Sequence, residues 1–141
     1  MEGVISFRDI YDINTMLDYC KTKKNAVVIG GGLLGLEAAY GLKQRGMNVT
    51  VLHLMDRIME RQLDSKASQM LRHSIEQKGI SIITEANTEA LVGVDGHVTQ
   101  IRLKDGTVLE ADLVVFAVGI RPNMALAQSA GLRCNRGVLV N

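Results

Sequence analysis

The sequence predicts an α/β fold, a Rossmann-like three-layer domain with a central parallel sheet and an inserted antiparallel β-meander. Three observations support this prediction. Short apolar runs such as residues 26–29 suit strands that are buried on both faces of a parallel sheet. This run meets glycines at once and is followed by a segment of helical periodicity. Two Asp-Gly pairs, Asp95-Gly96 and Asp105-Gly106, separate short alternating segments, which is typical of hairpins.

Length and composition indicate a single ordinary domain. A chain of 141 residues has room for one core. Lys and Arg number 16 and Asp and Glu 15, so no global charge would gather nucleic acid or an anionic membrane. The two cysteines, Cys20 and Cys134, form no metal or redox motif, and no apolar run reaches the roughly 20 residues of a membrane helix. We therefore expect a cytoplasmic protein without a metal, nucleic-acid or membrane partner.

Three segments are expected along the chain. Residues 1–24 include a helix from Ile10 to the polar run before residue 25. Residues 25–122 form the Rossmann-like domain, with the meander at about 86–112. Residues 123–141 begin with a short helix, for which Asn123 is a suitable N-cap, and end with the start of a strand.

Strands and helices alternate in the first part of the central segment. A helix is expected at about 33–45, stopped by Gly46, and a second parallel strand at 49–52. Asp64 is a plausible N-cap for the next helix, which Gly79 ends.

The strand pattern then resumes on both sides of the meander. Residues 80–83 form the third strand, and the apolar run 113–118 returns the chain to the core. Helical spacing places the following residues on the apolar faces of the helices between residues 10 and 79: Ile10, Ile13, Met16, Leu17, Leu34, Ala38, Leu42, Ala67, Met70, Leu71 and Ile75.

Gly30, Gly32 and Gly35 form a GxGxxG motif between a buried strand and an amphipathic helix, the context that dinucleotide binding requires. The first glycine allows the tight turn, the second lets the backbone approach a pyrophosphate, and the third lets helix and strand pack closely. The anion would lie on free amides at the helix start. The alternative is a glycine-rich turn without a ligand. No Lys-Ser/Thr pair follows, which excludes a nucleoside triphosphate P-loop.

Four further residues are candidates for contacts with the cofactor. Glu37 could accept a hydrogen bond at the nicotinamide end, or could only complement the helix dipole. His53 stands 23 positions after Gly30, where an acid that holds the adenosine ribose is expected. Without that acid, Arg57 and Arg61 could bind the 2′-phosphate of NADPH, or could be solvated surface charges. His53 can also hydrogen-bond a bare ribose, so both nucleotides stay open.

The segments "VVIGGGLLGLEAAYGLKQRGMNVTVLH" and "ADLVVFAVGIRPN", with the meander between them, resemble a known family. It is the NAD(P)H-binding domain of the FAD-dependent pyridine nucleotide-disulfide oxidoreductase superfamily. Within it, "VLHLMDRIMERQLD" is most similar to the large subunits of NAD(P)H-dependent nitrite reductases. Ferredoxin and rubredoxin reductases are the relatives with which such a domain is most easily confused.

The resemblance implies roles for particular residues. Gly30, Gly32 and Gly35 would bind the pyrophosphate with the amides of Leu33 and Leu34, Glu37 would lie near the nicotinamide, and Val118 and Gly119 would lie beside its ring. Arg121 and Pro122 would be structural. NADH or NADPH would bind here and meet the FAD domain of a parent chain. FAD, an iron-sulfur centre and sirohaem would belong to that parent alone, so the segment would be an excised, catalytically inactive domain.

Two other functions are compatible with a Rossmann loop. A stand-alone regulatory nucleotide sensor would explain the glycines but gives the meander no purpose. A short dehydrogenase would use a Tyr-x-x-x-Lys pair. Tyr19 and Lys23 have this spacing, whereas Tyr11 and Tyr40 have no lysine four residues later, and all three tyrosines lie early in the chain.

Overall fold

The computed structural model describes residues 1–119 and 122–140. Arg121, to which the resemblance gives a structural role, lies outside these residues. Within the described part the chain forms the following elements: β1 (Val4–Ser6), α1 (Ile10–Thr22), β2 (Asn25–Ile29), α2 (Leu33–Gln44), β3 (Asn48–Leu52), α3 (Ser65–Gln77), β4 (Ile80–Ile83), β5 (Thr88–Val94), β6 (His97–Leu103), β7 (Val108–Glu110), β8 (Leu113–Phe116) and α4 (Ala125–Ser129).

The central sheet has five parallel strands in the order β1-β8-β2-β3-β4. In the middle of this sheet, β2 pairs with β3 on one side and with β8 on the other. A separate antiparallel sheet has the order β5-β6-β7 and is the predicted meander. The fold class predicted from the sequence is therefore confirmed.

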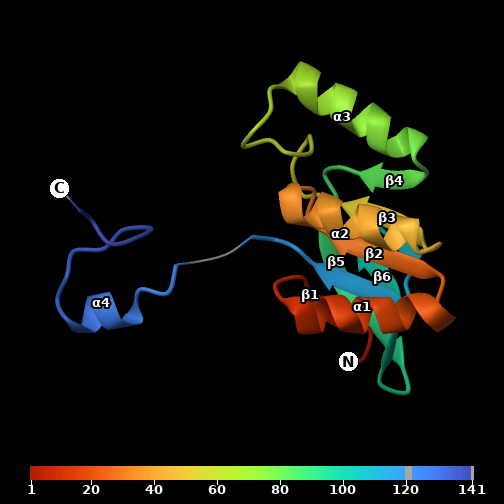
Figure 1. Cartoon of the computed structure of the whole chain (residues 1–141), viewed down its shortest axis with the longest axis horizontal. Helices are drawn as coiled ribbons and strands as arrows, with labels where there is room; N and C mark the ends of the chain where they lie inside the picture. Colours follow the sequence, from red (N-terminus) through yellow and green to blue (C-terminus); the bar gives the residue numbers. More distant parts are fainter. Residues whose placement is uncertain (120–121, 141) are drawn as a thin grey trace.

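Alternate residues of the parallel strands face two different layers. Val28 of β2 and Val115 of β8 belong to a core that includes residues of α1, α2 and α3. Val27 and Val114 belong to a second core, with Val98, Ile101 and Leu103 of the meander. Helices α1, α2 and α3 thus cover one face of the parallel sheet and the meander covers the other, as Figure 1 shows. Burial on both faces explains why these strands are continuously apolar.

The predicted helix starts are partly confirmed. Asp64 caps α3, since its Oδ1 accepts a hydrogen bond from the amide of Ala67 at 2.8 Å. Asn123 does not occupy the N-cap position of α4, which is Met124. Its side-chain oxygen accepts a hydrogen bond from the amide of Ala125, the first residue of α4, at 3.4 Å. Asn123 therefore contacts the helix start from the position before the N-cap.

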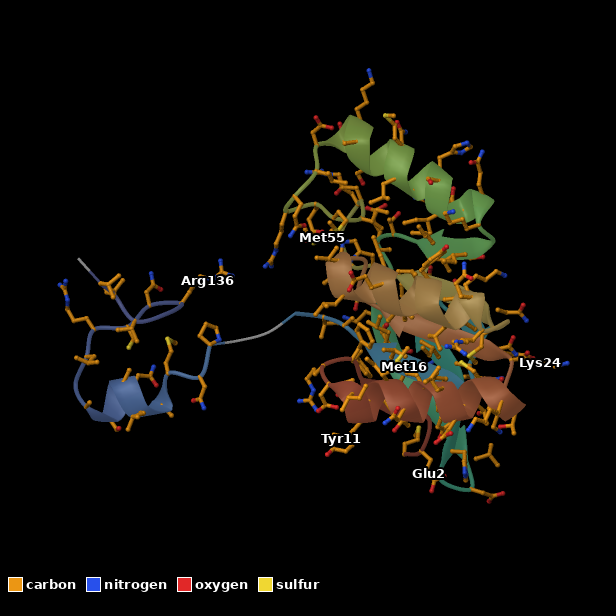
Figure 2. All side chains as sticks on the ribbon, viewed as in Figure 1. Glu2, Tyr11, Met16, Lys24, Met55 and Arg136 are labelled. Atoms are coloured by element: carbon orange, nitrogen blue, oxygen red, sulfur yellow. The ribbon has the colours of Figure 1, made fainter. Side chains whose placement is uncertain are left out.

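Some residues expected on apolar helix faces are exposed. Met16 is buried, whereas Ile10, Leu34 and Met70 are 60%, 47% and 67% exposed. Figure 2 shows Met16 on the side of α1 that faces α2, and Tyr11 on the opposite side, pointing away from the fold. The sheet edge explains Met70, because α3 packs over β4 at the end of the sheet and only a narrow stripe of the helix is covered. Ile10 and Leu34 instead line a hollow described below.

Both ends of the chain differ from expectation. Residues 4–6 pair with β8 as an edge strand, which the sequence reading did not predict. Near the other end, Val138 makes only an isolated antiparallel bridge with Cys134, and the expected strand is not formed in the described residues. None of residues 122–140 is buried.

Truncation of Leu42 tests the helix-side core. Leu42 is 1% exposed and lies in α2 against the central sheet, so Leu42→Ala should lower the free energy of unfolding by about 2–5 kcal/mol. Met70→Ala is the matched control, because Met70 is 67% exposed, and its effect should stay within about 0.5 kcal/mol. Urea unfolding measures both values, and equal losses would contradict this assignment of the core.

Candidate dinucleotide site

The glycine loop lies at the carboxyl ends of the parallel strands, where ligands bind in open α/β sheets. Gly30 follows β2 directly and has a φ of +123°, in the region that favours glycine. A Cβ at Gly30 would collide with the carbonyl of Ala117 after β8, and one at Gly35 would collide with the carbonyl of Gly30. These two glycines are therefore needed for the close contact between β2, α2 and the end of β8.

Gly32 has a different environment. It is the N-cap of α2, has no side-chain capping bond, and a Cβ built on it would meet nothing within 4 Å. Among the hydrogen bonds of the described residues, none is donated by the amides of Gly32, Leu33 or Leu34. The start of α2 thus offers free N–H groups and open space, which suits an anion such as a pyrophosphate.

Gly31, for which the sequence predicts no role, makes hydrogen bonds through both its backbone N–H and its carbonyl. Its N–H donates to Nδ1 of His53 at 3.0 Å, and its carbonyl accepts from the N–H of Met59 at 3.0 Å. A Cβ at Gly31 would lie 2.9 Å from both His53 and Ile58. The sequence carries no signal that distinguishes Gly31 from its open neighbour Gly32, because both stand in the same Gly-Gly-Gly run.

His53 therefore has a structural role that its spacing did not predict. Nδ1 accepts a hydrogen bond from Gly31, so the proton of the neutral ring resides on Nε2. Nε2 lies 3.0 Å from Oε2 of Glu60 and donates to it. The side chain of His53 is 11% exposed, and both ring nitrogens have protein partners. Contact between His53 and a ribose stays a prediction.

Arg57 and Arg61 lie in the same loop as Glu60. Nη1 of Arg57 is 3.3 Å from both carboxylate oxygens of Asp56. Arg61 is 76% exposed, with Nε 3.8 Å from Oε1 of Glu60. The two arginines therefore have acidic neighbours, and binding of a 2′-phosphate by either one stays a prediction.

A hollow of about 530 Å³ lies on the other side of the loop, beside the ends of β1 and β8. Leu34, Val118 and Gly119 line it together with residues 6–10 and Phe116. Val118, which is predicted to lie beside the nicotinamide ring, is 69% exposed and therefore accessible. Leu33, which is predicted to contribute a backbone amide to the pyrophosphate site, is 59% exposed. The structure thus places Val118 and Gly119 with the first turn of α2.

Glu37 lines an adjoining groove of about 270 Å³ between α1 and α2. Phe7 and Ile13 line both this groove and the hollow, so the two spaces are neighbours. Glu37 is not among the residues that line the hollow itself. Its role near the nicotinamide stays a prediction.

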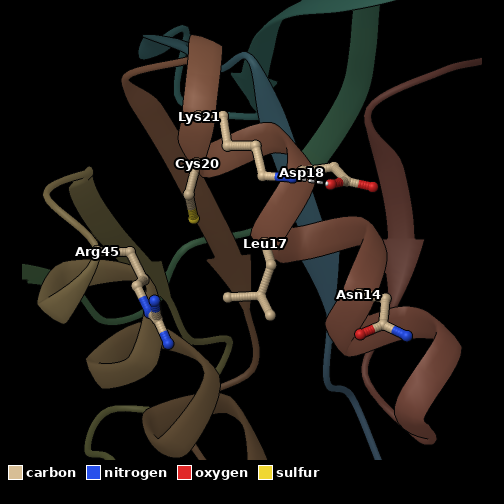
Figure 3. Close-up of a pocket in the computed structure, with 6 residues that line it drawn as sticks. All are labelled: Asn14, Leu17, Asp18, Cys20, Lys21 and Arg45. Atoms are coloured by element: carbon tan, nitrogen blue, oxygen red, sulfur yellow. Dashed lines mark hydrogen bonds and ion pairs between the residues drawn. The ribbon is translucent and has the colours of Figure 1, made fainter.

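A further groove of about 530 Å³ lies along α1, away from the glycine loop (Figure 3). Its lining residues include Cys20 and Arg45, and an ion pair between Asp18 and Lys21 at 2.7 Å lies at its rim. Burial raises the pKa of the Cys20 thiol, while the nearby charge of Arg45 acts in the opposite direction. The thiol lies 3.5 Å from Sδ of Met47, and the partly buried Cys20 packs against the helix-side core.

Residues 1–119 and 122–140 contain neither a candidate metal site nor a candidate membrane span. No group of three or more His, Cys, Asp or Glu side chains there could hold a metal ion. No helix within these ranges has the length and apolar character needed to span a membrane.

The comparisons with known proteins agree with one another. A family model described as pyridine nucleotide-disulphide oxidoreductase matches residues 1–141. The NAD(P)H nitrite reductase of Bacillus subtilis is 54% identical over 140 residues, which are 99% of this chain and 17% of that protein. The assimilatory nitrate reductase electron transfer subunit of the same organism is 44% identical over 140 residues, which are 99% of this chain and 18% of that protein.

Among solved structures, a ferredoxin reductase from Rhodopseudomonas palustris matches with a TM-score of 0.94 and 31% identity. The match covers 99% of this chain and 35% of that one. The chain spans less than a fifth of the length of the two Bacillus relatives, at 17% and 18%. These matches confirm the resemblance inferred from the sequence.

Substitution of Gly30 tests the packing of the loop. Gly30→Ala forces a Cβ into the backbone of Ala117 at a φ of +123°, so we expect a loss of at least about 2 kcal/mol of stability. Gly41→Ala is the matched control, because Gly41 lies within α2 and its Cβ would meet nothing within 4 Å. The control should gain about 0.5–1 kcal/mol from its higher helix propensity. Thermal unfolding distinguishes the two, and a neutral Gly30→Ala would contradict the geometry.

Proposed function

The chain belongs to the pyridine nucleotide-disulphide oxidoreductase family, and on that premise we propose that it is the NAD(P)H-binding domain of a flavin-dependent reductase. In this role it presents the nicotinamide to FAD for hydride transfer, within the large subunit of a nitrite reductase. The observation that carries the proposal is the open, uncapped start of α2, where Gly32 leaves room for a pyrophosphate. The similarity to a nitrite reductase, 54% over 140 residues, supports the parent enzyme.

The residues of the site fit a dinucleotide laid across the carboxyl edge of the sheet. The amides of Gly32, Leu33 and Leu34 would hold the pyrophosphate, and the hollow beside Val118 and Gly119 would receive the nicotinamide half. The bound nicotinamide supplies the hydride. The chain itself contributes binding and orientation, since hydride transfer needs the two rings at close range. In this scheme no side chain of the chain acts as an acid or base.

The equivalent domain of a ferredoxin or rubredoxin reductase is the second candidate. The TM-score of 0.94 with a ferredoxin reductase supports it, and so does 33% identity over 141 residues to a rubredoxin reductase of Ectopseudomonas oleovorans. Both alternatives share the same task of nicotinamide presentation and differ only in the electron acceptor of the parent. The higher identity to the nitrite reductase favours the first.

Gly32→Ala separates binding from folding. Its backbone has a φ of −86°, so alanine is tolerated and costs about 1 kcal/mol or less as a poorer N-cap. The new methyl group occupies the approach to the free amides, so we expect NADH affinity to fall at least roughly tenfold. Fluorescence titration of NADH against the wild type, Gly32→Ala and the control Gly41→Ala measures this. Unchanged affinity in Gly32→Ala would remove the loop from the binding site.

The isolated chain should bind NADH without oxidising it. Hydride transfer from the nicotinamide requires FAD, which we assign to the parent protein. NADH absorbance followed with added nitrite should stay constant for the 141-residue chain. Nitrite-dependent oxidation by this chain, without a flavin domain, would refute the division of tasks proposed here.

A further inference from the structure

Residue 53 lies at the position where Rossmann domains hold the adenosine ribose, directly after β3 and 23 positions beyond Gly30. It is a histidine, so the sequence places no negative charge there. The structure supplies one from elsewhere. Glu60, seven residues further on, has Oε2 3.0 Å from Nε2 of His53. One hydrogen-bonded ring therefore connects its carboxylate to the amide of Gly31 in the glycine loop.

The position of Glu60 is fixed by the residues just before it. The N–H of Met59 donates to the carbonyl of Gly31 at 3.0 Å, and Met59 has a φ of +54°. The carbonyl of Ile58 accepts a hydrogen bond at 2.7 Å from the hydroxyl of Ser68, which is 2% exposed. Because these bonds anchor the loop to both the glycine run and α3, Glu60 stays beside His53.

The charged side chains around Glu60 differ in their exposure to solvent. The side chain of Glu60 is 22% exposed, whereas that of Arg61, its nearest cation, is 76% exposed at 3.8 Å. Arg57 lies 3.3 Å from Asp56, and these two side chains are 38% and 67% exposed. An exposed arginine at this distance neutralises a carboxylate weakly, since solvent screens the pair. Among these four charged side chains, the carboxylate of Glu60 is therefore the least exposed to solvent.

We propose that Glu60 sets the cofactor preference of this site, by repelling the 2′-phosphate of NADPH and so favouring NADH. The inference rests on the proposed function and deepens it. The carboxylate that other Rossmann domains carry directly after the second strand is here displaced by seven residues along the chain and seated on His53. Like charges in a partly buried site disfavour binding, and selectivity then comes from this repulsive contact.

The experiment compares NADH and NADPH affinities of the 141-residue chain and of Glu60→Gln. Glutamine keeps the shape and an oxygen that can accept the Nε2–H of His53, so the fold should persist, which thermal unfolding verifies. Glu76→Gln is the matched control, because Glu76 is also ion-paired, with Arg72 at 2.8 Å, but lies on the outer part of α3.

We expect the wild type to bind NADH at least roughly tenfold more tightly than NADPH, and Glu60→Gln to reduce that ratio by roughly tenfold. The wild-type ratio should also fall as salt is raised, whereas Glu76→Gln should leave it unchanged. An unaltered ratio in Glu60→Gln overturns the proposal. Tighter binding of NADPH by the wild type also overturns it, in favour of a phosphate site at Arg57 and Arg61. If neither nucleotide binds the wild type, the proposed function itself fails.

Discussion

The close contact of Gly30 with the end of β8 is the constraint on which the site depends. There is no space for a Cβ between this residue and the carbonyl of Ala117, nor between Gly35 and the carbonyl of Gly30. Since β2, α2 and β8 meet at this one point, the first turn of α2 is fixed against the sheet with its amides facing outward. The hydrogen bonds of Gly31 to His53 and Met59 then fix the loop from the side of β3.

Much of this arrangement could be predicted from local patterns. The glycine spacing, the N-cap Asp64 and the two Asp-Gly turns are local signals, and they identified the parallel sheet, the helices and the meander. The features that could not be predicted depend on contacts between segments that are far apart in the sequence. The strand at residues 4–6 has only three residues, and its partner β8 follows more than a hundred residues later, so no local period reveals it.

Contacts at the adenosine end of the site could not be predicted from the sequence either. Spacing alone pointed to His53 as a departure from an acidic position and left Arg57 and Arg61 as candidate phosphate ligands. Only the folded loop brings Glu60 onto the imidazole and sets Asp56 against Arg57. A motif predicts the position at which a charge is needed. A side chain from a neighbouring turn can supply that charge instead, and its distance along the sequence from the motif is not fixed.

The alternation of β2 and β8 between two cores affects how such a domain can change over evolutionary time. Val28 and Val115 pack with the helices, while Val27 and Val114 pack with the meander, and the two sets meet only through the backbone of the sheet. Changes in side-chain volume on the meander side can therefore be compensated within that layer. Substitutions in the meander layer are therefore expected to leave the geometry of the glycine loop unchanged, because that loop depends on backbone contacts at the end of the parallel strands.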